Sequence, residues 1–407
     1  MNVLMIAPGY PAEMPLFARG LARVGAKVFG VADVPQDELP PLARQHLGGY
    51  LRVPSLVDED AVLEAVRRWV GTTTLRMERV VCLWEPGVLL AARIREALGV
   101  PGMTLDEAIP FRNKDAMKER VAVAGIRTPR HRSATSAFEV RDAAMLIGFP
   151  VIVKPIAGAG SMDTYRADDL AQLDAALARM EHIDEVNVEE FVDGEEFTFD
   201  TICIDGWVAY YNVSYYRPRP LAFRSTEWIS PMTYCLRDVG DPRLAAGISM
   251  GHEVLKALGF RTGFTHMEWY RKEDGEVVFG EIAARPPGAH TVDLMNFASD
   301  IDLFTGYAEA ELLGRFTQRV DRPYNAVNVF KRAEGRGRIQ RIEGLERIRR
   351  EFGPHIAHID LLPLGAPRRD WVQTLVSDGY VVLRHPDLSA LMRMADVVAT
   401  DLRLYAG

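Results

Sequence analysis

The segment FTHMEWYRKEDGEVVFGEIAAR, residues 264–285, predicts a β-hairpin that carries two carboxylates on one face. Asp274-Gly275 lies between apolar, β-prone runs, which is a strong short-range signal for a hairpin. If these two residues form the turn, Glu268 and Glu281 lie directly opposite each other, with Cβ atoms about 5 Å apart. Like charges at that distance repel, so the pair predicts a cation between them, and hard oxygen ligands favour Mg²⁺.

The rest of the hairpin favours a buried site over a solvated one. Its outer pairs are apolar on both faces, with residues such as Phe264, Trp269 and Phe279, and such a hairpin is normally central in a domain. Arg285 shares the face of Glu281, because side chains alternate along a strand. That face therefore offers two carboxylates for a metal ion and a guanidinium for an oxyanion.

Residues 149–161, FPVIVKPIAGAGS, predict a strand followed by a small-residue loop. Lys154 ends the strand, and the backbone N–H groups of the loop, which includes Gly160 and Ser161, could close over phosphates. A metal held by two glutamates usually also holds substrate phosphates, because Mg²⁺ resists a full protein cage. Each feature alone is weak, and their order relative to the hairpin is what indicates a nucleotide site.

Two further segments extend the predicted site. VEEFVDGEEFTFD, residues 188–200, predicts strand, tight turn and strand, with glutamates that could contact an adenine amino group and ribose hydroxyls. Upstream, a helix is predicted from near Asn113 to Gly125, with Lys114 in its first turn. The helix dipole disfavours a lysine there, which indicates a phosphate partner or, alternatively, a solvated surface position.

In this order the motifs resemble those of the ATP-grasp ligases, over roughly residues 80–310. The resemblance implies that Lys114 and Lys154 bind nucleotide phosphates and that Glu268 and Glu281 hold Mg²⁺. It implies that Arg285 steadies the transferring phosphoryl group, which makes Arg285, Glu281 and Lys154 the candidate catalytic residues. It also implies an adenine pocket and a ribose contact formed by Glu189, Glu190, Phe191, Val192 and Glu196.

One position departs from the commonest pattern of the family. Many members have an asparagine, a further metal ligand, where this chain has Ala283, whereas the purine-pathway members resemble this chain in having alanine or serine. Activity is therefore still expected, and the departure leaves open whether one or two metal ions bind.

The predicted fold class is α/β with the ATP-grasp fold. Residues 1–105 alternate strand and helix signals and predict a parallel, helix-flanked sheet. We expect a first nucleotide lobe over residues 106–188, a second lobe with the metal hairpin over 189–320, and a small C-terminal subdomain over 321–407. The first loop, APGYPAEM, is not a GxGxxG motif, so a dinucleotide site is not supported.

Composition excludes several classes of protein. The net charge of −8 and the absence of a basic block argue against nucleic acid as a partner. No apolar run is long enough to span a membrane, and the N-terminal residues predict a first strand rather than a signal peptide. Three cysteines without ligand spacing argue against a disulfide framework, so a cytoplasmic location is expected. A homodimer is a further expectation.

The segment YYRPRPLAFRSTEW, residues 215–228, concentrates arginines among aromatic residues and prolines. It is either a surface loop that is basic by chance or a mobile flap that meets an anionic substrate or the ATP phosphates. The candidate substrate contacts are Arg217, Arg219, Arg224, His266 and His290.

By resemblance, the expected reaction activates a carboxylate with ATP as an acyl phosphate, which an amine then attacks. Three hypotheses remain. The first is a carboxylate–amine ligase of the amino-acid ligase branch, acting on small-molecule substrates. The second is a purine-type enzyme that uses formate or bicarbonate, although APGYPAEM lacks the glycine-rich loop for a ribonucleotide phosphate. The third is a nucleotide-binding regulator without turnover, which the intact glutamates and lysines argue against.

Overall fold

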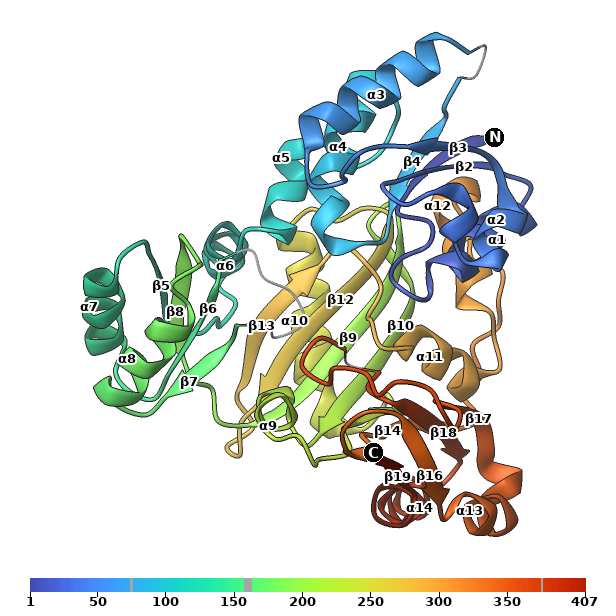
Figure 1. The fold of residues 1–407 in the computed structure, drawn as a ribbon. Helices are drawn as coiled ribbons and strands as arrows, with labels where there is room; N and C mark the ends of the chain where they lie inside the picture. Colours follow the sequence, from blue (N-terminus) through green and yellow to red (C-terminus); the bar gives the residue numbers. More distant parts are fainter. Residues whose placement is uncertain (74–75, 157–162, 375) are drawn as a thin grey trace.

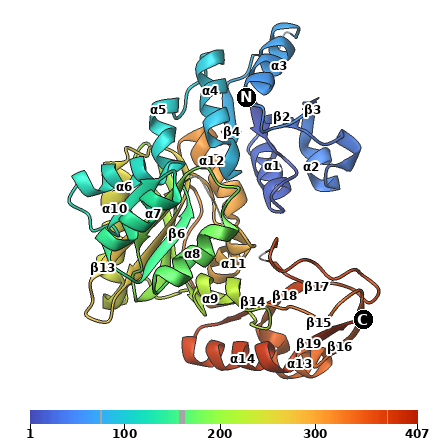
Figure 2. The same ribbon diagram turned by 60° about the vertical axis from the view of Figure 1, so that its left-hand side comes forward.

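The computed structural model describes residues 1–73, 76–156, 163–374 and 376–407, whose strands form four sheets (Figure 1). Seen from a second direction, the N-terminal sheet, the small lobe and the C-terminal elements surround the central eight-stranded sheet (Figure 2). The candidate site is built where these parts meet, so the fold is described from the outside inward.

The N-terminal sheet is parallel, with strand order β3-β2-β1-β4, as the sequence predicts. Apolar runs fill strands that helices cover on both faces. Sequence reasoning missed α2 and β3, because LGGYLR lacks a clear apolar run. Gly49 is required in it, since a Cβ there would lie 2.8 Å from the ring of Phe29. The elements are β1 (Asn2–Ile6), α1 (Met14–Arg23), β2 (Lys27–Ala32), α2 (Pro41–His46), β3 (Leu47–Arg52), α3 (Glu59–Gly71), β4 (Arg79–Cys82) and α4 (Val88–Leu98).

A connecting segment joins this sheet to the small lobe. It contains α5 (Leu105–Ala108) and α6 (Lys114–Val123). The side chain of Asn113 caps α6 by accepting hydrogen bonds from the N–H groups of Asp115 and Ala116. The predicted helix start at Asn113 is thus confirmed, and Lys114 is its first residue.

The small lobe is an antiparallel sheet of order β5-β8-β6-β7 with two helices packed on it. The apolar faces of the helices meet Val151, Val153 and Val188 in one core. Lys154 follows this core near the end of β6, as predicted. The elements are β5 (His131–Ala134), α7 (Ala137–Ile147), β6 (Val151–Pro155), β7 (Tyr165–Ala167), α8 (Leu170–Arg179) and β8 (Val186–Glu190).

The chain then crosses from the small lobe to the large sheet between β8 and β9. The predicted strands in 188–200 exist, but they belong to different sheets and do not pair. The large sheet has the order β13-β12-β9-β10-β11-β14-β18-β17. Its strands are β9 (Glu195–Ile204), β10 (Trp207–Arg217), β11 (Met232–Cys235), β12 (Gly263–Arg271), β13 (Val277–Ala283), β14 (Asn325–Phe330), β17 (Ile356–Leu361) and β18 (Gly379–His385).

Helices cover the two faces of the large sheet differently. On one face, α10 (Pro242–Ala257) packs against Trp269, which stacks on Phe197 with ring centroids 4.8 Å apart. Gly247 of α10 permits this approach, because a Cβ there would lie 2.2 Å from the indole. On the other face, α11 (Thr291–Ser299) and α12 (Leu303–Leu313) share a core with α1 of the N-terminal sheet (Figure 1).

The hairpin pairs Glu268 with Glu281, as predicted, but the turn that produces this pairing differs from the predicted one. The turn contains three residues, Glu273–Gly275, which shifts the pairing near the turn by one residue. A bulge at Gly280 shifts it back, so the predicted register holds for the outer half of the hairpin. A Cβ on Gly280 would lie 2.8 Å from the carbonyl oxygen of Glu268, which explains the glycine.

The C-terminal residues do not form a separate layer. Strands β14, β18 and β17 continue the large sheet across the expected boundary near residue 320, because β11 pairs with β14. The remaining elements pack beside them and include a three-stranded sheet. They are α9 (Pro220–Ser225), β15 (Glu334–Gly335), β16 (Ile339–Glu343), α13 (Leu345–Phe352), α14 (Leu388–Asp401) and β19 (Arg403–Ala406). Among the described residues, none of the helices combines the length and apolar character needed to cross a membrane.

Candidate active site

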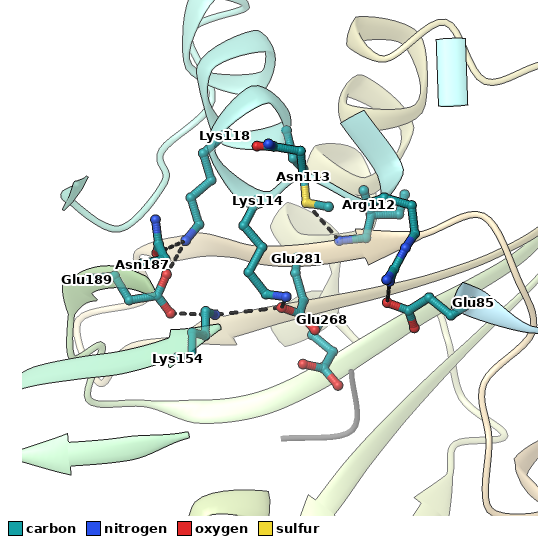
Figure 3. Close-up of polar contacts among 12 residues, drawn as sticks. Glu85, Arg112, Asn113, Lys114, Lys118, Lys154, Asn187, Glu189, Glu268 and Glu281 are labelled. Atoms are coloured by element: carbon teal, nitrogen blue, oxygen red, sulfur yellow. Dashed lines mark hydrogen bonds and ion pairs between the residues drawn. The ribbon is translucent and has the colours of Figure 1, made fainter. Parts of the chain in front are cut away.

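The metal hairpin forms the floor of a cleft between the small lobe and the large sheet (Figure 3). Glu268 and Glu281 project from paired positions on β12 and β13. The Nζ atoms of Lys114 and Lys154 lie 3.7 and 3.6 Å from Oε2 of Glu281. Burial opposes ionisation of this carboxyl, but the lysines outweigh it and lower the pKa of Glu281 to about 2. Three separate segments, a helix start, a strand end and the hairpin, therefore converge on one carboxylate.

A second cluster of charged side chains, which is buried, contacts Lys154. Glu189 of β8 lies between Lys154, with its Nζ 2.5 Å from Oε1, and Lys118, which contacts Oε2. Lys118 also donates to Oδ1 of Asn187 at 3.2 Å. Burial opposes ionisation of Glu189, but the two lysines lower the pKa of Glu189 to about 2. Glu189 was expected in the adenine pocket, and its carboxylate contacts Lys154 and Lys118.

Sequence reasoning missed Lys118, whose side chain is fully buried. Burial lowers the pKa of Lys118 to about 8, although Glu189 acts in the opposite direction. The available signal was its spacing, since Lys118 follows Lys114 by four residues and therefore lies on the same face of α6. Asn187 was also missed, and its Nδ2 donates to Oδ1 of Asp115 at 2.6 Å, which joins the small lobe to α6.

The predicted adenine segment lines the far end of the cleft. Phe191 lies between two guanidinium groups, with Arg166 at 4.1 Å and Arg219 at 5.2 Å from its ring centroid. Arg219 donates to the carbonyl oxygen of Val192 at 3.1 Å. Glu190 lines the cleft too, and its carboxylate accepts two hydrogen bonds from Arg127 at 2.8 and 3.0 Å.

Glu196, the predicted ribose contact, is buried at the same end of the cleft. Nε of Arg219 lies 3.4 Å from its Oε2. Burial, reinforced by the charge of Glu268, raises the pKa of Glu196 to about 8. Of the three arginines in 215–228, Arg219 is thus the one placed against the predicted nucleotide contacts.

The other two arginines contact the C-terminal part of the chain. Arg217 pairs with Asp396 of α14, with N–O distances of 2.7 and 3.5 Å. Arg224 lies in α9 and donates to the carbonyl oxygen of Val372 at 2.8 Å. The structure therefore does not bring Arg217 and Arg224 to the cleft with Arg219.

Arg285 is held by an acidic residue of the N-terminal part of the chain. Its Nη2 and Nε lie 2.6 and 2.8 Å from Oε2 of Glu85. The other oxygen of Glu85 accepts from Arg112 at 2.7 Å. Burial opposes protonation of Arg285, but Glu85 outweighs it and raises the pKa of the guanidinium. Sequence reasoning missed Glu85, which is far from the recognised motif residues, and Arg112, which precedes the N-cap of α6 and so shares no helix face with Lys114.

The two candidate histidines have different surroundings. His266 lies between Asp200, with Nδ1 2.6 Å from Oδ1, and Glu268, with Nε2 3.5 Å from Oε1. Burial opposes protonation, yet Asp200 raises the pKa of His266 to about 9. His266 therefore links the metal hairpin to the centre of the large sheet, and its position suits holding Glu268.

His290 does not line the cleft and lies at a junction of three parts of the chain. Its backbone N–H donates to Oε1 of Glu13 at 2.6 Å, and its Nδ1 lies 3.0 Å from Asp293. Its ring stacks on Tyr380, with centroids 4.9 Å apart. Gly160 and Ser161, the predicted phosphate loop, lie outside the described residues.

The donor set at the hairpin fits a magnesium ion. Glu268 and Glu281 supply hard carboxylate oxygens on one face, and Mg²⁺ commonly takes one or two carboxylates and fills its remaining positions with phosphates and water. In the described ranges, no group of three or more His, Cys, Asp or Glu side chains gathers in a metal-binding arrangement. A site of this composition thus suits a metal that arrives with phosphates rather than one held by protein alone.

Comparison with known proteins shows what this chain is similar to. Residues 147–293 match the ATP-grasp domain family. The chain is 26% identical over 218 residues to an L-arginine-specific L-amino acid ligase of Bacillus subtilis, covering 52% of each chain. It is 32% identical over 184 residues to a formate-dependent phosphoribosylglycinamide formyltransferase of Erythrobacter litoralis, covering 43% of this chain and 45% of the relative. The matches thus span about half the length of these curated relatives.

The whole chain also superimposes on a solved structure. An L-amino acid ligase from Bacillus licheniformis covers 100% of this chain and 98% of its own, with a TM-score of 0.80 and 21% identity. The chain therefore has the ATP-grasp fold, as predicted. Within that fold it resembles the L-amino acid ligase branch of the carboxylate–amine ligases.

Proposed function

We propose that the protein is an ATP-dependent ligase that activates a carboxylate and joins it to an amine, releasing ADP and phosphate. The observation that carries this proposal is the convergence of Lys114, Lys154 and Arg285 on the face that presents Glu268 and Glu281. A cleft with opposed carboxylates and cations suits phosphoryl transfer, in which positioning and charge neutralisation dominate over covalent chemistry.

The lysines would bind the phosphates of the nucleotide. Both ammonium groups lie near the carboxylate of Glu281, and Lys154 also contacts the buried carboxylate of Glu189 (Figure 3). Preorganised cations of this kind stabilise developing negative charge without reorganisation. Lys118 would act indirectly, because its contact with Glu189 holds the carboxylate that in turn orients Lys154.

Glu268 and Glu281 would hold Mg²⁺, which when bound would supply positive charge against the phosphate oxygens. His266 would keep Glu268 in place, because it is held by Asp200 on its other side. An imidazolium between two carboxylates is a poor general base, so we assign His266 to positioning.

Arg285 would contact the acid substrate and the group transferred to it. A guanidinium binds carboxylate and phosphoryl oxygens through two parallel N–H donors. Glu85 fixes its orientation through Nε and Nη2, and Arg112 fixes Glu85 in turn. Phe191, Val192 and Glu196, with Arg219, would surround the adenosine end of ATP.

An amino-acid substrate is favoured over a ribonucleotide by the first loop of the chain. In the purine-type members a glycine-rich loop there binds a phosphate, whereas this chain places the buried carboxylate of Glu13 in that loop. Glu13 accepts from the backbone of His290, five residues after Arg285. A carboxylate at this position would repel a phosphate and suits the ammonium group of an amino acid.

The test is a substrate screen with two readouts. The protein is mixed with ATP, Mg²⁺ and every pair of the standard amino acids, and phosphate release and product mass are measured together. Formate with glycinamide ribonucleotide, and bicarbonate with aminoimidazole ribonucleotide, serve as the purine-type arm. Dipeptide mass with stoichiometric ADP supports the proposal. Turnover in the purine-type arm alone, or ATP binding with no product in any arm, contradicts it.

A further inference from the structure

A second cavity of about 480 Å³ lies between the N-terminal sheet and the end of the large sheet. Its walls come from β4, α4, α12 and the ends of β9 and β12. In both views β4, α4 and α12 lie at one end of the molecule (Figures 1 and 2). It shares no lining residue with the nucleotide cleft. Its volume is in the range of small-molecule sites.

A guanidinium is fixed in one wall of this cavity. Nε of Arg95 donates to the carbonyl oxygen of Val80 at 2.9 Å, and its Nη1 donates to that of Met103 at 3.1 Å. Two backbone acceptors therefore set the plane of the group, and Nη2 has no hydrogen bond to the described residues. Since Arg95 lines the cavity, a donor is held ready for an anionic ligand.

A carboxylate lies in the same cavity. Glu311 of α12 makes neither an ion pair nor a hydrogen bond with any residue that the structure describes, and burial raises its pKa. The positive charges of Arg95 and Arg79 act to lower this pKa, but neither side chain contacts Glu311. Gly263 lies beside it, and a Cβ there would be at ordinary contact distance, 3.7 Å from Oε2 of Glu311. A partly buried carboxylate without partners is costly, and a cationic ligand group would reduce that cost.

The remaining walls are mixed, with apolar side chains beside polar ones that include Arg79, Glu107, Asp205 and Arg261. Leu83, Val88 and Phe111 line one side, and Phe264 and Leu312 line another. All five side chains are buried or partly buried in the surrounding cores. The cavity therefore places the guanidinium of Arg95 and the carboxylate of Glu311 beside a group of apolar side chains.

We propose that this cavity is a binding site for a free α-amino acid with an apolar side chain. Arg95 binds the carboxylate, Glu311 binds the ammonium group, and the apolar wall residues receive the side chain. The wall residues Leu83 and Val88 flank Glu85, and the wall residue Ala284 precedes Arg285. A bound amino acid would thus touch both segments that set the position of the catalytic arginine, as an effector site requires.

The binding experiment uses the full chain without ATP, so its outcome does not depend on the proposed ligase activity. Thermal unfolding is recorded with each of the twenty L-amino acids, and binding of L-leucine is measured by calorimetry. Isocaproate, which lacks the amino group, and isoamylamine, which lacks the carboxylate, are titrated beside it. We expect leucine to bind at least about tenfold more tightly than either, because each analogue leaves one buried charge unpaired.

Two matched variants assign the binding to this cavity. Glu311→Gln keeps the size of the side chain, breaks no hydrogen bond in the described structure, and is expected to weaken leucine binding at least about tenfold. Asp205→Asn removes another carboxylate that lines the cavity, one already paired with Arg261 at 3.0 Å, and is expected to leave binding unchanged. Absence of binding for all twenty amino acids, or equal binding by wild type and Glu311→Gln, overturns the proposal.

Discussion

Two sets of cations in this sequence, two lysines and three arginines, differ in how their separation along the chain relates to their positions in the fold. Lys114 and Lys154 are forty residues apart, yet both reach Glu281. Arg217, Arg219 and Arg224 lie within eight residues, yet Arg219 contacts the cleft while the other two contact the C-terminal part of the chain. Along the chain the arginines are close together and the lysines are far apart, which is the reverse of their arrangement in the fold.

The difference teaches that a shared partner, and not proximity along the chain, makes a charged site. The lysines sit at element ends, a helix start and a strand end, that the fold directs at the same hairpin. The arginines follow one another through the end of β10 and into α9, so successive side chains point in different directions. Four predictions test this contrast, beginning with the largest expected effect.

Glu281→Gln should reduce ligation by at least about 100-fold, because it removes the carboxylate on which both lysines and the proposed metal converge. The measurement is phosphate release with the substrate pair found in the screen, at saturating and limiting Mg²⁺. Glu276→Gln is the matched control, since Glu276 precedes the same strand and pairs with Lys272 at the surface. Near wild-type turnover of Glu281→Gln at limiting Mg²⁺ would remove Glu281 from the metal site.

Glu189→Gln should destabilise the fold by about 3 kcal/mol at pH 7, because it leaves Lys118 buried without its carboxylate partner. The folded pKa of Glu189 is lowered to about 2, so its contribution is present above the unfolded pKa of about 4.3 and is lost as the pH falls towards 2. Urea unfolding of both proteins at pH 7 and pH 3 should therefore show a difference that shrinks on acidification.

Glu190→Gln is the control for that measurement, because the neighbouring carboxylate pairs with the partly exposed Arg127. Glu190→Gln should lower the free energy of unfolding by less than about 1 kcal/mol. Equal losses of unfolding free energy for the two variants would mean that the buried Lys118 does not need a charged partner more than the partly exposed Arg127 does.

Arg219→Lys should raise the KM for ATP by about five- to tenfold and leave the KM for the acid within about twofold. A lysine keeps the charge but loses the planar fork that stacks on Phe191 and donates to Val192. Steady-state kinetics with each substrate varied in turn provides the measurement. A rise confined to the acid would instead support the substrate role expected for this segment from the sequence.

Arg217→Lys and Arg224→Lys should change either KM by less than about twofold, since both side chains contact the C-terminal part of the chain. The same kinetic series measures them. If either matched Arg219→Lys, the segment would act as one unit and the contrast between the two cation sets would fail.

Much of the site could be predicted because its features are local. The turn, the alternation along the strands and the cap at Asn113 depend on neighbouring residues, and each appears in the structure. The register of Glu268 with Glu281 was predicted from a two-residue turn, whereas a longer turn and a bulge at Gly280 produce the same pairing. The bulge could not be foreseen, because it is set by how closely Gly280 approaches the carbonyl of Glu268.

The sequence by itself determined the hairpin, the lysine-bearing helix start and strand end, and the parallel N-terminal sheet, because period and turn chemistry act over a few residues. Only the tertiary structure decided which charges meet. Lys118 with Glu189, Glu85 with Arg285, and Glu311 opposite Arg95 are brought together by packing between distant elements. No pattern along the chain encodes which surfaces pack together and become buried.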